Sequence, residues 1–159
     1  MRVSILTISD SVSAGKSEDR SGPSVSSRCK QLGWEVVSAA VRADDHAAIV
    51  GFLKQTADSN AVDLILTTGG TGLGPRDVTP EATAAVVERL IPGFPERMRA
   101  AGAAKTPRAI LSRGAAGIRG ATIIINLPGS PTGAVESLDA VADLLPHSVA
   151  VLHGLHHGS

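Results

Sequence analysis

The stretch Val62–Thr83, VDLILTTGGTGLGPRDVTPEAT, combines a strand pattern, a glycine-rich loop and the pattern of a helix start. Residues 62–68 are strongly apolar, which predicts a buried strand. After the glycines, Thr79 is the predicted N-cap of a helix, Pro80 suits its first position, and Glu81 favours the positive end of the helix dipole. A strand that passes through a loop into a helix is typical of an α/β fold.

The same order of elements recurs near the C-terminus. Residues 123–126 are a predicted strand, Ser130 is a predicted N-cap and Pro131 fits the first helical position. The remaining patterns predict strands over 2–9 and 34–41, helices over 22–32, 43–57 and 92–104, an irregular link or hairpin over 112–120, and an apolar helix face at Val135, Leu138, Ala142 and Leu145. We therefore expect a single three-layer α/β domain over residues 1–152, with a largely parallel central sheet flanked by helices.

The composition excludes several classes of function. A chain of 159 residues that is 43% hydrophobic suits one domain with a sizeable core. Its 15 basic and 15 acidic residues balance, and only 2% of residues are aromatic, so nucleic acid is not an expected partner. No apolar stretch approaches the roughly 20 residues of a membrane helix, and no leader pattern opens the chain. We expect a soluble, cytoplasmic protein with no membrane partner.

Two isolated features are expected to have structural explanations. The single cysteine, Cys29, has no partner for an internal disulfide, and its helical context predicts a buried small apolar residue. The tail over residues 153–159 contains His153, His156 and His157 and is expected to be loose rather than a metal site.

The glycine-rich loop is the strongest candidate for a ligand site. Gly69, Gly70, Gly72 and Gly74 follow a predicted strand and precede a predicted helix, where backbone N–H groups and a helix N-terminus favour an anion. The loop is not a Walker A motif, because Gly74 is followed by Pro75, and it lacks the frame of a dinucleotide fingerprint. From local pattern, we expect a phosphate cradle with an acidic residue, Asp77, beside it.

Four segments together resemble the molybdopterin-binding Mog/MoaB-like family, which includes bacterial molybdopterin adenylyltransferases, the G domain of gephyrin and the matching domain of plant molybdenum-insertion proteins. They are LTISDSVSAGKSEDRSGP (6–23), LILTTGGTGLGPRDVTPEAT (64–83), AILSRGAAGIRG (109–120) and IIINLPGSPTGAVE (123–136). The likeness is greater to the Mog and plant type than to the MoaB branch. The resemblance implies an α/β domain, usually a homotrimer, that adenylates molybdopterin with ATP and Mg²⁺ and releases pyrophosphate.

The resemblance also implies roles for individual residues. Asp77 matches the catalytic acidic residue of the family, and Asp44 matches a second functional aspartate, although the adjacent Asp45 is an alternative. Both Asp77 and Asp44 are candidate Mg²⁺ ligands, since Mg²⁺ prefers oxygen donors. The expected substrate- and nucleotide-binding residues are Asp10, Ser11, Thr68, Gly69, Gly70, Thr71, Gly72, Arg76, Ser112, Pro128, Gly129 and Ser130, and Arg113 is a further candidate for phosphate contact.

Three hypotheses of function remain open at this stage. The first is an adenylyltransferase, whose product passes to a molybdenum-insertion protein. The second is a non-catalytic molybdopterin-binding or scaffold protein of the MoaB type. The third is a nucleotide-binding domain with an unrelated small-molecule reaction. The intact Asp77 and Asp44 favour the enzyme, because phosphate attack on ATP depends on positioning and charge stabilisation more than on a protein nucleophile.

Overall fold

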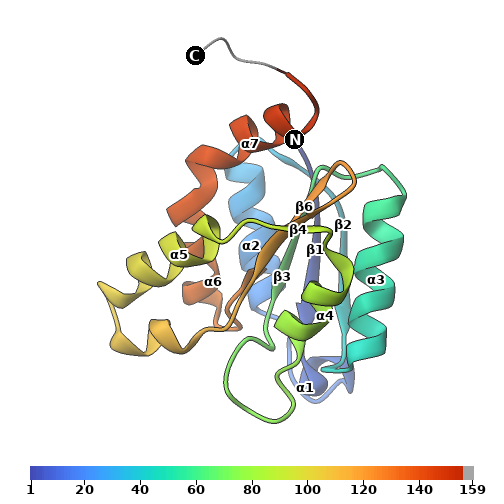
Figure 1. Ribbon diagram of the computed structural model, residues 1–159. Helices are drawn as coiled ribbons and strands as arrows, with labels where there is room; N and C mark the ends of the chain where they lie inside the picture. The colour runs from blue at the N-terminus through green and yellow to red at the C-terminus, as the bar shows by residue number, and fades with distance from the viewer. Residues whose placement is uncertain (156–159) are drawn as a thin grey trace.

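The computed structural model describes residues 1–155 and contains a six-stranded sheet between two layers of helices (Figure 1). The strands lie in the order β2-β1-β3-β6-β5-β4, of which the first four are parallel and the last two pair antiparallel. Their bounds are β1 Arg2–Ile8, β2 Glu35–Arg42, β3 Leu64–Thr68, β4 Arg89–Leu90, β5 Ala116–Arg119 and β6 Thr122–Leu127. The predicted three-layer α/β fold with a largely parallel sheet is confirmed.

The helices divide between the two faces of the sheet (Figure 1). One face is covered by α2 (Ser21–Gln31), α5 (Gly93–Ala103), α6 (Pro131–Val141) and α7 (Leu145–Leu152), and the other by α3 (His46–Asp58) and α4 (Thr79–Val86). The described residues also contain three short helices, which are α1 (Asp10–Ser13) and the 3-10 helices η1 (Pro107–Leu111) and η2 (Ala142–Leu144). None of the described helices is long and apolar enough to cross a membrane.

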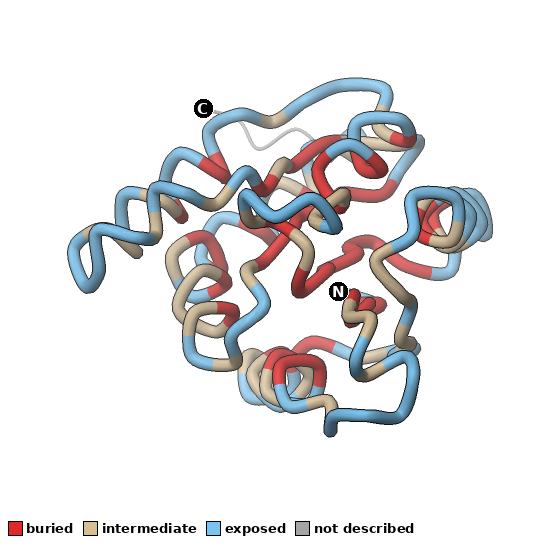
Figure 2. Tube along the Cα trace, turned by 90° about the horizontal axis from the view of Figure 1, so that it is seen from below, coloured by how far each residue is buried: buried red, intermediate tan, exposed pale blue. Residues whose placement is uncertain are grey.

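The core follows from the alternation of side chains along the central strands. In β3, Leu64 and Leu66 pack toward α2 and α5, whereas Ile65 packs toward α3 and α4. Because helices cover both faces, these strands are apolar on both sides, which explains their continuous hydrophobic pattern. Cys29 is buried as expected, and burial raises the pKa of its thiol to about 11. Seen from below, the buried stretches turn inward and the exposed turns lie outside (Figure 2).

Several local predictions need correction. Thr79 is not the N-cap of α4 but its first residue, and its hydroxyl donates to the carbonyl of Gly69 instead. The segment after β1, for which no element was predicted, contains the short helix α1, and the helix face predicted from Val135 to Leu145 is interrupted by η2. Asp45 is the N-cap of α3, and its side chain accepts the amide hydrogen of Ala48.

After α7, the structure describes residues 153–155. The ring of His153 lies 3.0 Å from the carbonyl oxygen of Ala121 and 3.9 Å from the carboxylate of Asp63. His156 and His157 of the predicted tail lie outside the described residues.

Candidate functional site

The loops that follow the central parallel strands begin side by side at one edge of the sheet. Thr68, the last residue of β3, pairs with Thr7 of β1 and with Leu127 of β6. This edge faces downward in Figure 1, where the glycine loop extends beside α1. Ligands of open α/β sheets bind beyond this end of the strands, because the loops and helix N-termini converge there.

Two glycines give the loop a backbone that other residues adopt only with strain. Gly69 and Gly70 have φ angles of 105° and 71°. A Cβ atom on Gly69 would overlap the carbonyl oxygen of Ile8, and one on Gly70 would overlap the hydroxyl of Thr79. The loop is therefore packed directly against the end of β1 and the start of α4, which only glycine permits.

Some backbone amides and carbonyls of this loop have hydrogen-bond partners within the protein, and others do not. The amide of Gly69 donates to Leu127, and the carbonyls of Gly69 and Gly70 accept from Thr79. Among residues 1–155, no protein acceptor takes the amide hydrogens of Gly70, Thr71 or Gly72. Unpaired amides on a glycine loop are suitable donors for an anion, as the sequence predicted.

Asp77 is held beside these amides by the loop itself. Its carboxylate accepts the amide hydrogen of Gly74 at 2.9 Å, and its own amide donates to the carbonyl of Gly74. A Cβ atom on Gly72 or Gly74 would lie 3.0 or 2.9 Å from the same carboxylate oxygen. The two glycines therefore leave room for the Asp77 side chain.

Asp10 and Asp44 form a second acidic group through reciprocal contacts. The amide of Asp10 donates to the carboxylate of Asp44, and the amide of Asp44 donates to that of Asp10, both at 3.0 Å. Arg76 donates to both carboxylate oxygens of Asp10 at 3.0 Å, and these bonds lower the pKa of Asp10. Burial raises the pKa of Asp44, and the nearby charges of Asp10 and Asp77 raise it further. The Asp44 carboxylate is thus the less favourably ionised of the pair.

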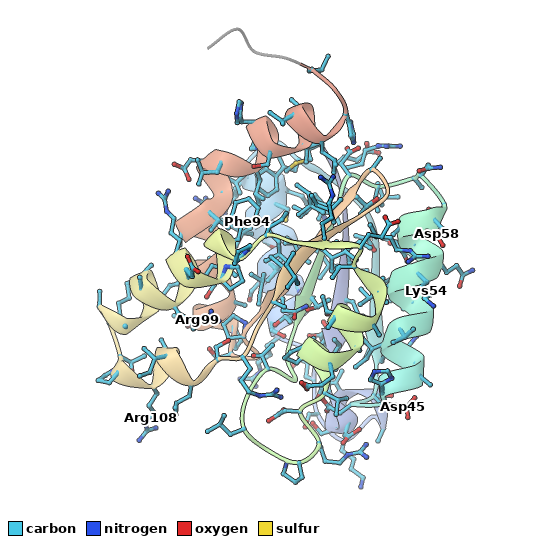
Figure 3. The ribbon with its side chains drawn as sticks, viewed as in Figure 1. Asp45, Lys54, Asp58, Phe94, Arg99 and Arg108 are labelled. Carbon is cyan, nitrogen blue, oxygen red and sulfur yellow. The ribbon has the colours of Figure 1, made fainter. Side chains whose placement is uncertain are left out.

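The structure separates Asp44 from Asp45, which the sequence left as alternatives. Asp44 lines a cavity together with Asp77, whereas Asp45 caps α3 and lies at the start of that helix (Figure 3). Asp44 is therefore the aspartate available to a ligand.

Two cavities are lined in part by the glycine loop. The α5-side cavity, of about 460 Å³, extends toward α5 and η1, and the α1-side cavity, of about 400 Å³, extends toward the segment after β1. Gly70, Asp77 and Gly129 line both. Two ligands, one in each cavity, would therefore meet at these three residues.

The other predicted residues fall into three groups. Thr71, Gly72, Ser112, Pro128 and Ser130 line the α5-side cavity, and Ser11, Thr68 and Gly69 line the α1-side cavity. Asp10 and Arg76 line neither. Ser130 also caps α6, accepting the amide hydrogen of Gly133 at 3.0 Å, and the hydroxyl of Thr68 donates to the carbonyl of Pro128.

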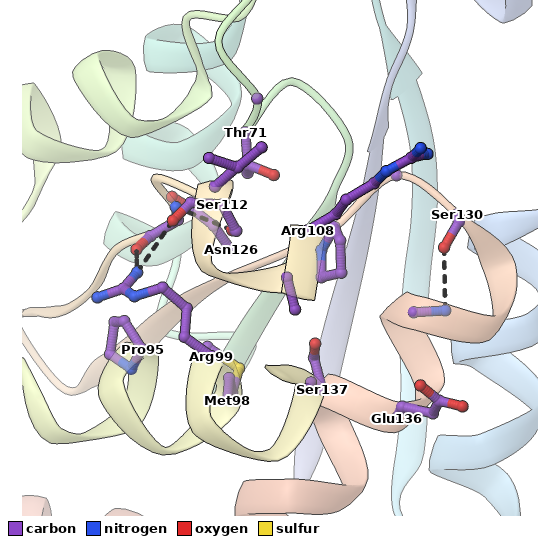
Figure 4. Close-up of a pocket in the computed structure, with 18 of the residues that line it drawn as sticks. Thr71, Pro95, Met98, Arg99, Arg108, Ser112, Asn126, Ser130, Glu136 and Ser137 are labelled. Atoms are coloured by element: carbon purple, nitrogen blue, oxygen red, sulfur yellow. Dashed lines mark hydrogen bonds between the residues drawn. The ribbon is translucent and has the colours of Figure 1, made fainter. Parts of the chain in front are cut away.

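One wall of the α5-side cavity was not foreseen. It is lined by Pro95, Met98 and Arg99 of α5 and by Arg108 and Ala109 of η1, and Figure 4 shows Arg108 extending away from the three α5 residues. Arg99 donates to the carbonyls of Ser112 and Gly114, which ties α5 to the segment after η1. No motif marks these residues in the sequence, because they come together only when α5 and η1 pack beside the sheet.

The carboxylates that line the α1-side cavity suit Mg²⁺ bound together with substrate phosphates rather than a metal ion held by protein ligands alone. Within residues 1–155 no group of three His, Cys, Asp or Glu side chains is placed to hold a metal. Asp44 and Asp77 supply hard oxygen donors on the same cavity. Mg²⁺ is commonly bound through one or two carboxylates together with substrate phosphates, so these two residues fit it.

Comparisons with known proteins point to one family. Residues 4–147 match the family described as a probable molybdopterin binding domain. A molybdopterin adenylyltransferase of Helicobacter pylori is 38% identical and covers 97% of this chain and 89% of its own length. A crystal structure of the molybdopterin biosynthesis enzyme MoaB of Thermus thermophilus is 47% identical, with a TM-score of 0.91 and 96% of each chain covered. The expected preference for the Mog type over MoaB is therefore not resolved by identity.

A longer relative shares the same region. A molybdenum cofactor biosynthesis bifunctional protein of Synechococcus elongatus is 40% identical over 98% of this chain. The chain spans only 48% of that protein.

Proposed function

This chain belongs to the molybdopterin-binding MoaB/Mog family of molybdenum cofactor biosynthesis, and on that premise we propose that it is a molybdopterin adenylyltransferase. The observation that carries the proposal is the meeting of two cavities at Gly70, Asp77 and Gly129. A transfer between two phosphate-bearing substrates requires such a meeting point, because the attacking and departing groups must lie in line. A site for a single ligand has no need of it.

The proposed reaction balances without a protein nucleophile. An oxygen of the terminal phosphate of molybdopterin attacks the α-phosphorus of ATP and forms a new P–O bond. The bond between the α-phosphorus and the oxygen that leads to the β-phosphate breaks, and pyrophosphate leaves. Since the attacking oxygen is already anionic, the protein contributes position and charge stabilisation rather than a strong base.

The residues around the meeting point are assigned roles on this basis. The free amides of Gly70, Thr71 and Gly72 bind phosphate oxygens, and the N-terminus of α6 beside Gly129 adds a favourable dipole. Asp77 and Asp44 would hold Mg²⁺, which neutralises phosphate charge when bound. Asp10, paired with Arg76, orients Asp44 through its backbone amide.

Product formation tests the proposal directly. The purified protein is incubated with molybdopterin, ATP and Mg²⁺, and adenylated molybdopterin and pyrophosphate are quantified. We expect both products in equal amounts, and their loss when any one component is omitted. Tight molybdopterin binding with neither product would refute the enzyme and support the alternative, a non-catalytic binding protein of the MoaB type.

The proposal extends to the organisation of the protein. We propose that residues 1–152 act as one molybdopterin-binding domain, that it assembles as a homotrimer, and that it works in the cytoplasm, where ATP is available. Its adenylated product would be handed to a molybdenum-insertion protein. Light scattering checks the assembly: we expect the mass of three chains, and the mass of one chain would overturn this part of the proposal.

A further inference from the structure

Arg113 binds the glycine loop from a segment that is distant in sequence. Its backbone amide donates to the carbonyl of Thr71, its Nε to the carbonyl of Gly72, and its Nη2 to the carbonyl of Asp77, each at 2.8 Å. One residue thus holds both arms of the loop, before and after its tip. Arg113 lines neither of the two cavities, so these contacts come from behind the loop.

The guanidinium is itself held by α4. Nη1 lies 2.8 Å and Nη2 lies 3.1 Å from the two carboxylate oxygens of Glu81, in the first turn of the helix. This pairing lowers the pKa of Glu81. Nε, Nη1 and Nη2 therefore all have protein acceptors, which argues against the phosphate contact expected from the sequence. A planar guanidinium can donate to the carbonyls of Gly72 and Asp77 and to the carboxylate of Glu81 at the same time. The ammonium group of lysine does not have this planar set of donors.

One of these contacts also sets the direction of a loop amide. All described peptide bonds are trans, so the carbonyl of one residue and the amide hydrogen of the next point in opposite directions. With the carbonyl of Thr71 turned toward Arg113, the amide hydrogen of Gly72 points away from it. The amide of Gly72, one of the three donors that we assign to phosphate, is thus oriented by Arg113, whereas Thr79 holds the carbonyls that precede the other two.

We propose that Arg113 is a positioning residue that orients the glycine loop and Asp77 for the transfer, an inference that rests on the proposed function. The Arg113–Glu81 pair is 37% and 48% exposed, and exposed ion pairs contribute at most about 1 kcal/mol to stability. Removal of the side chain should therefore loosen the loop more than it weakens the fold. Misplacement of reacting groups by about 1 Å can lower a rate about 100-fold.

The test compares Arg113→Ala and Arg113→Lys with Arg97→Ala. Arg97 makes an exposed ion pair with Asp143 and lines neither cavity, so it is a matched control. Backbone hydrogen exchange over residues 70–78, kcat, KM for ATP and Tm are measured. For both Arg113 variants we expect faster exchange, a kcat lower by about 10- to 100-fold with a smaller change in KM, and a Tm within about 3 °C of wild type. Arg97→Ala should match wild type.

Chemical rescue separates positioning from a general loss of structure. Added guanidinium at millimolar concentration should restore part of the kcat of Arg113→Ala, but not that of Arg113→Lys, whose side chain fills the space. The inference would be overturned if hydrogen exchange over residues 70–78 and kcat were unchanged in both Arg113 variants. It would also be overturned if kcat fell only in proportion to the fraction of unfolded protein. If the wild-type protein forms no adenylated product, the proposed function fails, while hydrogen exchange still tests the loop contacts.

Discussion

At the scale of single residues, Asp77 is the side chain on which the proposed chemistry depends most. It lies where the two cavities meet and is held there by the amide of Gly74. Asp44 and Asp10 lie beside it, but their carboxylates are partly committed to each other's amides. Of these three carboxylates, only that of Asp77 lines both cavities.

For Asp77→Asn we expect kcat to fall about 100-fold or more, because a charge that acts on the metal or the transition state is removed with little change of shape. The affinity for molybdopterin should change much less. Titration calorimetry with molybdopterin and a rate assay measure the two effects. Equal losses of affinity and rate would indicate a binding role for Asp77 instead.

The glycine loop allows a prediction with a closely matched control. Gly70→Ala places a Cβ atom against Thr79 and Asp44, whereas Gly33, with a similar φ of 81°, has nothing within 4 Å of that position. Gly33→Ala should destabilise the protein by about 1 kcal/mol through backbone strain. Gly70→Ala should lose a further 1 kcal/mol or so from crowding, and should also lower ATP affinity. Urea unfolding and ATP titration of both variants check this.

At the scale of elements, the starts of β1 and β3 are joined by one carboxylate. Asp63, just before β3, accepts from the backbone amide of Arg2 at 2.7 Å and from its guanidinium at 3.0 Å. Burial opposes ionisation here, but the hydrogen bonds from Arg2 outweigh it and hold the pKa of Asp63 below its ordinary value. The side chain of Asp63 is only 10% exposed, so this contact should contribute to stability.

The lowered pKa of Asp63 predicts how the stability of the fold depends on pH. The stabilisation is fully present above the unfolded-state pKa of about 4 and is lost as the pH falls through the folded-state value. We expect Asp63→Asn to lower the free energy of unfolding by about 1 kcal/mol at pH 7, with the gap from wild type narrowing below about pH 4. Asp139→Asn, which removes an exposed ion pair with Arg28, serves as control. A gap that is constant with pH would refute this assignment.

Another element-scale feature is the buried amide of Asn126 in β6. It donates to Thr67 of β3 and Thr83 of α4, and accepts from the amide of Ala115. Four segments therefore meet at one polar side chain, close to the strand ends that carry the site. Because the side-chain oxygen and nitrogen of Asn126 both have hydrogen-bond partners, the polar side chain can be buried at this position without a large energetic cost.

At the scale of the whole molecule, the site exists because the sheet brings three strand ends to one edge and α5 and η1 close one side of it. A bulky residue in the lining of the α5-side cavity should fill that cavity and leave the other open. We expect Ser137→Trp, on α6, to weaken the binding of one substrate, molybdopterin or ATP, by at least about tenfold and to leave the other within about twofold, because the large side chain would occupy space in that cavity. Separate titrations with each substrate check this, and equal losses for both would argue against two separate binding sites.

Much of the fold and part of the site could be predicted because they depend on neighbours in sequence. The strand predicted over residues 62–68, which the structure has at Leu64–Thr68, the glycines after it and the cap at Ser130 are local patterns, and they placed the loop and Asp77 correctly at the sheet edge. The role of Thr79 was mistaken, because its hydroxyl is taken by Gly69 through a contact that only the folded loop creates.

The sequence by itself determined the α/β class and the family resemblance, and it predicted a phosphate site at the glycine loop, since propensity, capping and motif spacing are properties of adjacent residues. Only the tertiary structure decided that Asp44 rather than Asp45 faces the cavity, that two cavities meet at Asp77, and that Arg113 holds the loop from behind. These depend on packing between segments as far apart as Asp77 and Arg113, and such contacts form only when the sheet and its helices assemble.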